Sequence, residues 1–142
     1  MRCGAATVIS KGRLLMQDWM KMSAAALGHG IEAGEIDPVD LAQTFLDAAA
    51  AHPMSNCIYA RLTPERALSE AKAASVRAKA GQRLSPLDGV PVSWKDLFDT
   101  AGVATEAGSA LLKDRVPTRD AEVLRVATAM GAVCIGKTHM SE

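Results

Sequence analysis

The sequence of 142 residues has little of several features that mark particular classes of protein. Its three cysteines are odd in number and far apart, and neither CxxC nor His-x-x-x-His spacing accompanies them. This pattern gives no support to a disulfide framework or a metal site and is typical of reduced thiols in a cytoplasmic protein. No apolar run approaches the roughly 20 residues of a membrane helix. The net charge is zero, with 16 basic and 16 acidic residues, so no nucleic-acid partner is expected.

What is present is the composition of an ordinary globular chain. Hydrophobic residues make up 49% and charged residues 23%, and the length suits one domain or part of one. Near the start, Ser10, Lys11 and Arg13 interrupt the apolar run before it reaches the length of a secretory signal. We expect residues 1–17 to be a loose tail and residues 18–142 to form the domain.

The first half of the chain shows the start and stop signals of helices. Asp37 followed by Pro38 is typical of an N-cap and first helical position, and Thr63 with Pro64 repeats the pattern. Gly81 is the expected C-terminal stop of the second of these helices, which is rich in alanine and is therefore expected on a surface. The predicted helices span residues 19–33, 38–51 and 64–80.

The second half changes to an alternation of strand and helix. GVPVSWKD, residues 89–96, is short, β-branched and bounded by turn residues, so it predicts a strand. A long irregular segment over 97–117 follows. Asp120 is expected to cap a helix over 121–130, with Gly131 ending it, and residues 132–136 predict a second buried strand. Strand, excursion, helix and strand together favour an α/β fold.

GAVCIGKT, residues 131–138, matches the phosphate-binding pattern G-x-x-x-x-G-K-[ST]. In a nucleotide-binding P-loop the four variable residues form a compact loop between a strand and a helix. Here Gly131 follows a predicted helix, and the variable residues are apolar and β-branched, as in a strand. We therefore expect a strand that leads into a turn, and the alternative is a nucleotide-binding protein built on Lys137.

Lys95 stands at the carboxyl end of the predicted strand, where the sites of open α/β sheets form. A lysine held there among apolar neighbours has a lowered pKa, so its neutral amine becomes available as a base. The alternative is a lysine whose amine reaches water, and most lysines at strand ends do only that.

PLDGVPVSWKDLFDTAGVATEAGS and PTRDAEVLRVATAMGAVCIGKTHMSE resemble the amidase signature family of Ser-Ser-Lys hydrolases. The resemblance runs from about Met22 to Glu142 and implies the N-terminal part of an α/β/α fold, with N-terminal helices followed by strand, loop, helix and strand of a mixed sheet. It also implies that Lys95 is the catalytic lysine, buried and bonded to a serine. A small-molecule amide would be the substrate, and neither a metal nor an organic cofactor is implied.

Five further residues fall on motif positions of this family and are expected to be structural. Asp120 would cap a helix, Gly108 and Ser109 would form a turn, and Asp96 and Asp99 would order the loop. Three histidines are expected at the surface or in caps, and two cysteines in packing roles. These are His29, His52, His139, Cys57 and Cys134.

The sequence departs from the family most clearly in one respect. Family members continue into a Gly/Ser-rich segment that supplies both serines and the oxyanion hole, and no serine of these 142 residues lies in such a setting. We therefore expect an amidase activity only in a longer parent protein, none in these residues alone, and apolar surface and free strand edges in the fragment. The nearest alternative is the glutaminase subunit of a tRNA-dependent amidotransferase. A homodimer, or partner subunits for the amidotransferase, would be the macromolecular partners.

Overall fold

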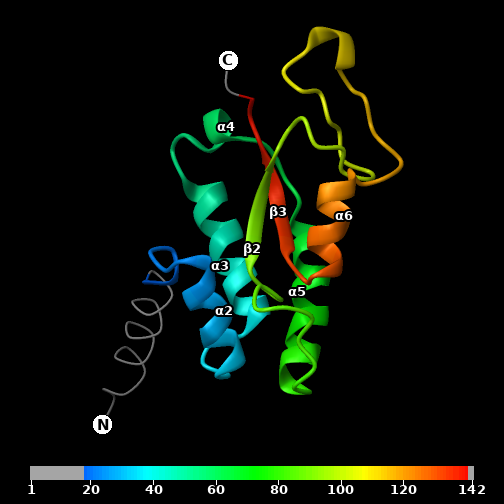
Figure 1. Ribbon diagram of the computed structural model, residues 1–142. Coiled ribbons are helices and arrows are strands. Elements are labelled where there is room, and N and C mark those ends of the chain that lie inside the picture. Colours follow the sequence, from blue (N-terminus) through cyan, green and yellow to red (C-terminus); the bar gives the residue numbers. More distant parts are fainter. Residues whose placement is uncertain (1–17, 141–142) are drawn as a thin grey trace.

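The computed structural model describes residues 18–140, so the expected tail over 1–17 lies outside the described residues. Helices lead into a small sheet, and a long excursion returns through one more helix to the central strand (Figure 1). In chain order the elements are α2 (Ala24–Glu32), α3 (Pro38–Ala51), α4 (Ser55–Ile58), β1 (Tyr59–Leu62), α5 (Pro64–Lys79), β2 (Pro91–Lys95), the 3-10 turn η1 (Ala110–Leu112), α6 (Glu122–Ala129) and β3 (Val133–Thr138).

Local sequence signals explain where α3 begins and where α5 ends. The Asp37 carboxylate accepts from the Val39 N–H at 2.9 Å, with Pro38 as the first residue of α3, as predicted. Gly81 has a φ of +66° directly after the last turn of α5, which is the left-handed conformation expected of a C-terminal stop. Thr63 precedes α5 but does not cap it, because its hydroxyl donates instead to the Cys134 carbonyl at 2.9 Å.

The sheet has three strands in the order β1-β3-β2. β2 pairs with β3 in parallel and β1 pairs with β3 antiparallel, which confirms the predicted mixed sheet. Both pairings contain a register shift, between Val92 and Ser93 in β2 and between Tyr59 and Arg61 in β1. The strand β1 and the short helix α4 were not predicted from the sequence.

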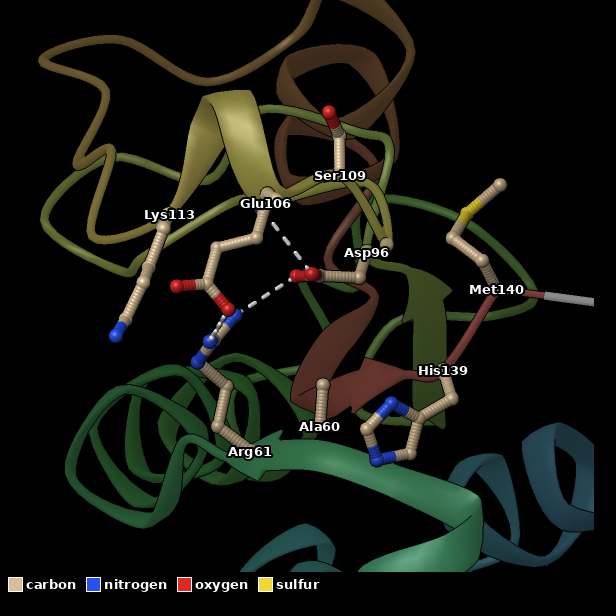
Figure 2. Close-up of a pocket in the computed structure, with 10 residues that line it drawn as sticks. Ala60, Arg61, Asp96, Glu106, Ser109, Lys113, His139 and Met140 are labelled. Carbon is tan, nitrogen blue, oxygen red and sulfur yellow. Dashed lines mark hydrogen bonds and ion pairs between the residues drawn. The ribbon is translucent and has the colours of Figure 1, made fainter.

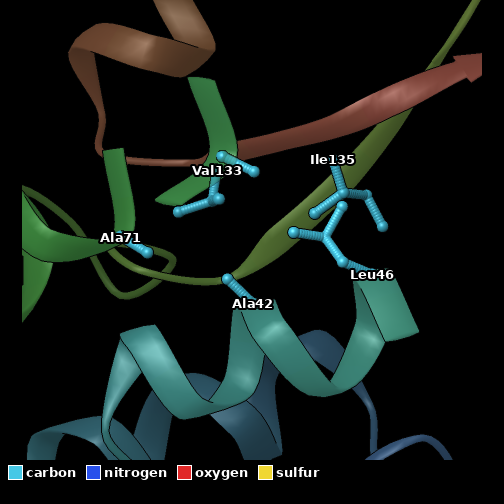
Figure 3. Packing of buried hydrophobic residues seen from close by; sticks show 6 residues of the cluster. Ala42, Leu46, Ala71, Val133 and Ile135 are labelled. Atoms are coloured by element: carbon cyan, nitrogen blue, oxygen red, sulfur yellow. The ribbon is translucent and has the colours of Figure 1, made fainter. Parts of the chain in front are cut away.

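One core cluster lies where α3 and α5 cover β3 (Figure 3), and a second joins α2 to α3 and Val90. Ala42 and Leu46 of α3 and Ala71 of α5 pack against Val133 and Ile135 of the central strand. The small alanines let the α5 backbone approach the strand closely, so this helix has one buried face. The helix lies on the surface, as predicted, with its alanine side packed against the sheet and its opposite side exposed.

The excursion between β2 and α6 is tied down by an ion pair and not by the predicted helix cap. Asp120 does not cap α6, whose first flanking residue is Ala121 with no side-chain cap. Instead Asp120 accepts two hydrogen bonds from the Arg66 guanidinium, at 2.9 and 2.8 Å, and a third from the Ala101 N–H at 2.8 Å. The guanidinium group of Arg66 donates two hydrogen bonds to the carboxylate, and this bidentate geometry favours Arg66 over the helix end as the partner of Asp120.

Apolar side chains remain exposed on α6. Leu124 is fully buried, but Val123 and Met130 are each 46% exposed. β2 stands at one edge of the sheet, and its outer side has no partner strand among residues 18–140. The expected exposed apolar surface and free strand edge are thus both found in the described chain.

Candidate active site

Lys95 is the last residue of β2, opposite Thr138 in the register with β3. Its amine donates to the His139 carbonyl at 3.0 Å, and its side chain is exposed. The expectation that apolar neighbours enclose this amine is wrong for the described chain, because Lys95 is exposed at the end of an edge strand. The catalytic role of Lys95 stays a prediction.

A cavity of about 400 Å³ opens on the side of His139, next to this strand end. Figure 2 shows its lining: Arg61 and Ala60 come from β1, His139 and Met140 follow β3, and Glu106, Ser109 and Lys113 come from the excursion after β2. The residue that follows Lys95, Asp96, also borders the cavity. The cavity and the Lys95 amine thus share His139 and the end of β2.

Asp96 is the centre of a compact charge network between β1 and the excursion. Its carboxylate accepts from the Arg61 guanidinium at 2.9 Å and from the Glu106 N–H at 3.1 Å. The same guanidinium donates to the Glu106 carboxylate at 2.8 Å. The Asp114 N–H, and after it Arg61, hold the pKa of Glu106 below its ordinary value. These contacts close one wall of the cavity and confirm Asp96 as an acceptor that orders the loop.

Lys137 lies behind this network and is fully buried, with 0% of its side chain exposed. Its amine donates to the Phe98 carbonyl and to the Thr105 hydroxyl, both at 2.8 Å, and lies 3.5 Å from the Asp96 carboxylate. Burial lowers the pKa of the Lys137 amine, and the charge of Asp96 opposes this shift. Lys137 had no role predicted from the sequence outside the nucleotide-binding alternative. A lysine inside an otherwise apolar strand was the signal that could have found it.

The P-loop interpretation fails on the same residues. Val133 to Thr138 form a strand, as expected, so no phosphate-binding loop is present there. The amine of Lys137, which would have to reach a phosphate, is instead enclosed and bonded within the protein.

Other residues singled out from the sequence have structural roles. Asp99 binds Arg115 through two hydrogen bonds at 2.6 and 2.7 Å, Ser109 caps η1 by accepting from the Leu111 N–H, and Gly108 has a φ of +66° in the same turn. These observations confirm the predicted loop-ordering and turn-forming roles.

The histidines and cysteines follow the expectations with one exception. His29, His52 and His139 are exposed, and His52 follows the last residue of α3. Cys134 is buried, which raises the pKa of its thiol, whereas Cys57 is exposed and the packing role expected for it is wrong. Within residues 18–140 no group of three potential ligand side chains is placed to hold a metal ion. No helix in this part of the chain has the length and apolarity to cross a membrane.

The mixed sheet and the lysine at the end of β2 agree with what the resemblance to the amidase signature family implies. Comparison with known protein families matches residues 40–142 to the family described as Amidase. The chain belongs to this family.

Relatives and solved structures agree with this assignment. A glutamyl-tRNA(Gln) amidotransferase subunit from Marinobacter nauticus is 40% identical over 120 residues, which cover 84% of this chain and 24% of the relative. The peptide amidase from Stenotrophomonas maltophilia superimposes with a TM-score of 0.77 at 35% identity, covering 85% of this chain and 25% of that structure. An amidase family protein from Bacillus anthracis gives a TM-score of 0.80 at 26% identity, with coverages of 94% and 27%. The chain therefore spans about a quarter of the length of the proteins it matches.

Proposed function

We propose that this chain supplies the lysine of an amidase that hydrolyses a non-peptide carbon–nitrogen amide bond. Lys95 would accept the proton that a serine pair releases, so that one serine attacks the amide carbonyl and forms an acyl-enzyme. Ammonia or an amine would leave, and water would release the acid. The observation that supports this proposal is the position of the Lys95 amine at the carboxyl end of β2, 3.0 Å from the carbonyl of His139, which itself borders the cavity.

The serines of this mechanism are not assigned to any residue of the chain. The 142 residues contain no Gly/Ser-rich segment of the family type, so neither a nucleophile nor an oxyanion hole is available within them. We therefore propose that these residues alone do not turn over an amide and that activity belongs to a protein in which they are joined to the serine-bearing segment.

The test is Lys95→Ala in such a protein, with Lys72→Ala on the exposed face of α5 as the matched control. Removal of a positioned proton acceptor lowers kcat by about 10²–10⁴-fold. Lys72→Ala should leave kcat unchanged, and circular dichroism should report both variants as folded. Turnover of Lys95→Ala above about a hundredth of the parent rate contradicts the assignment.

A second candidate is the glutaminase subunit of a tRNA-dependent amidotransferase. The observation that favours it is the 40% identity to the amidotransferase protein of Marinobacter nauticus. Release of ammonia from glutamine, measured with and without partner subunits, separates the two candidates. Release that requires the partners supports the amidotransferase, and partner-independent hydrolysis of simple amides supports the amidase.

A further inference from the structure

The buried amine of Lys137 has no part in the proposed proton transfer, yet each of its N–H groups has an acceptor nearby. The amine has three donors and meets three acceptors: the Phe98 carbonyl, the Thr105 hydroxyl and, at 3.5 Å, the Asp96 carboxylate. All three acceptors belong to the segment that directly follows Lys95. The Lys137 amine therefore holds the first ten residues of the excursion, 96–105, against the sheet.

Packing alone does not require a charge at this place. A buried ion pair gains little stability over apolar side chains of the same volume, because desolvation offsets the attraction between the charges. What an ammonium group adds is direction, since each N–H requires an acceptor at a defined position. Arg61, opposite Lys137 in the register of β1 and β3, approaches the same Asp96 carboxylate at 2.9 Å. Two cations thus hold Asp96 from two strands.

The position of Lys95 depends on the same two backbone segments, the start of the excursion and the end of β3. It directly precedes Asp96, whose N–H donates to the Thr138 carbonyl at 2.9 Å. Its amine donates to the carbonyl of His139, two residues after Lys137. The Lys137 amine thus joins the segment that carries Lys95 to the strand end that receives its hydrogen bond.

We propose that Lys137 is a positioning residue that holds the Lys95 amine against the His139 carbonyl by fixing Asp96 and the loop behind it. The catalytic meaning of this position rests on the proposed function, but the positioning itself does not. Without the Lys137 amine, Phe98 and Thr105 lose their donor, the loop after β2 loosens, and the Lys95 side chain samples several directions.

The experiment is NMR of the 142-residue chain labelled with ¹³C-lysine, with the Lys95 signals assigned from their loss in Lys95→Arg. A fixed lysine side chain gives its two Cε protons separate chemical shifts, and a freely rotating one averages them. We expect a resolved splitting for Lys95 in the parent chain and loss of more than half of it in Lys137→Met. Lys79→Met is the matched control, since it makes the same substitution at an exposed ion pair with Asp37.

Loss of stability alone would not produce this result, because the splitting is read in folded protein well below Tm. A splitting that survives in folded Lys137→Met, or that is absent from the parent, overturns the proposal. Should Lys137→Met fail to fold, Thr105→Val decides the matter, since it removes one acceptor of the amine at nearly constant volume. A reduced splitting in that variant supports the positioning role, and an unchanged one refutes it. Neither result alters the outcome of the Lys95→Ala assay, so the two proposals fail separately.

Discussion

The ion pair between Arg66 and Asp120 predicts a specific loss of stability in Asp120→Asn. The Asp120 carboxylate accepts two bonds from Arg66 of α5 and one from the Ala101 N–H, and so anchors the excursion to the helical layer. Asparagine keeps one oxygen, which can still accept from Ala101. It removes the negative charge and the second acceptor, so Arg66 is left with Glu70 as its only carboxylate partner among the described residues.

The size of the expected loss of stability follows from how deeply the Arg66–Asp120 pair is buried. The side chains of Arg66 and Asp120 are only 20% and 19% exposed, so the pair lies between the surface and the interior. A charge-assisted hydrogen bond contributes about 1.5–3 kcal/mol, and removing one partner of a fully buried pair costs about 3–5 kcal/mol. We expect Asp120→Asn to lower the free energy of unfolding by about 2 kcal/mol, which for a chain of this size lowers Tm by roughly 6–8 °C.

Glu122→Gln is the matched control. Glu122 pairs with Arg125 three residues further along α6, but the two side chains are 73% and 63% exposed, so water screens the interaction. Thermal unfolding followed by circular dichroism should show no measurable change of Tm for this variant. If Asp120→Asn costs no more than Glu122→Gln, the excursion is not anchored by this ion pair.

The ion pair between Arg66 and Asp120 also determines how stability changes with pH. Arg66 holds the pKa of Asp120 below its ordinary value. A carboxylate with a lowered pKa in the folded state contributes its stability above the unfolded-state pKa of about 3.9 and loses it as the pH falls through the folded value. The Tm difference between the parent and Asp120→Asn should therefore be constant near neutral pH and shrink below about pH 4.

Two further predictions concern backbone geometry and thiol access. Gly131→Ala should lower the free energy of unfolding by at least about 2 kcal/mol, because φ is +91° and the new Cβ would lie 2.2 Å from the Asp88 carboxylate. Gly81→Ala, with φ of +66° and nothing within 4 Å, should cost about 1 kcal/mol in the same denaturant titration, and equal costs would contradict the steric argument. In the folded chain, peptide mapping after maleimide treatment should find Cys57 modified and Cys134 unmodified until denaturant is added, and early labelling of Cys134 would show that β3 opens.

The helix boundaries could be predicted from the sequence because their signals are local. Asp37 and Pro38 act on the first turn of α3, and Gly81 acts within two residues of the end of α5, so no distant partner decides the outcome. Asp120 and Thr63 carry the same kind of signal but bind elsewhere, since Arg66 and the Cys134 carbonyl approach them from distant parts of the chain. A side chain that can cap a helix takes the partner that the tertiary fold provides.

The site was predictable in part for the same reason. The motif around Lys95 placed it at a strand end, which the structure confirms. Its exposure was not foreseen, because burial depends on which strands and loops reach the edge of the sheet. β1 escaped prediction since its four residues show no regular alternation and pair only with the distant β3. The inward amine of Lys137 depends on the loop that folds over it, and no local rule places that loop.

The contact between Lys95 and His139 joins two residues that are 44 positions apart in the chain. The excursion and α6 lie between them, so the amine meets its acceptor only when β2 has paired with β3 across this long separation. Closing the intervening loop costs entropy, so a contact between distant residues needs the support of the strand pairing around it. The hydrogen bond at the end of β2 therefore depends on the pairing of β2 with β3 and is lost when the two strands separate.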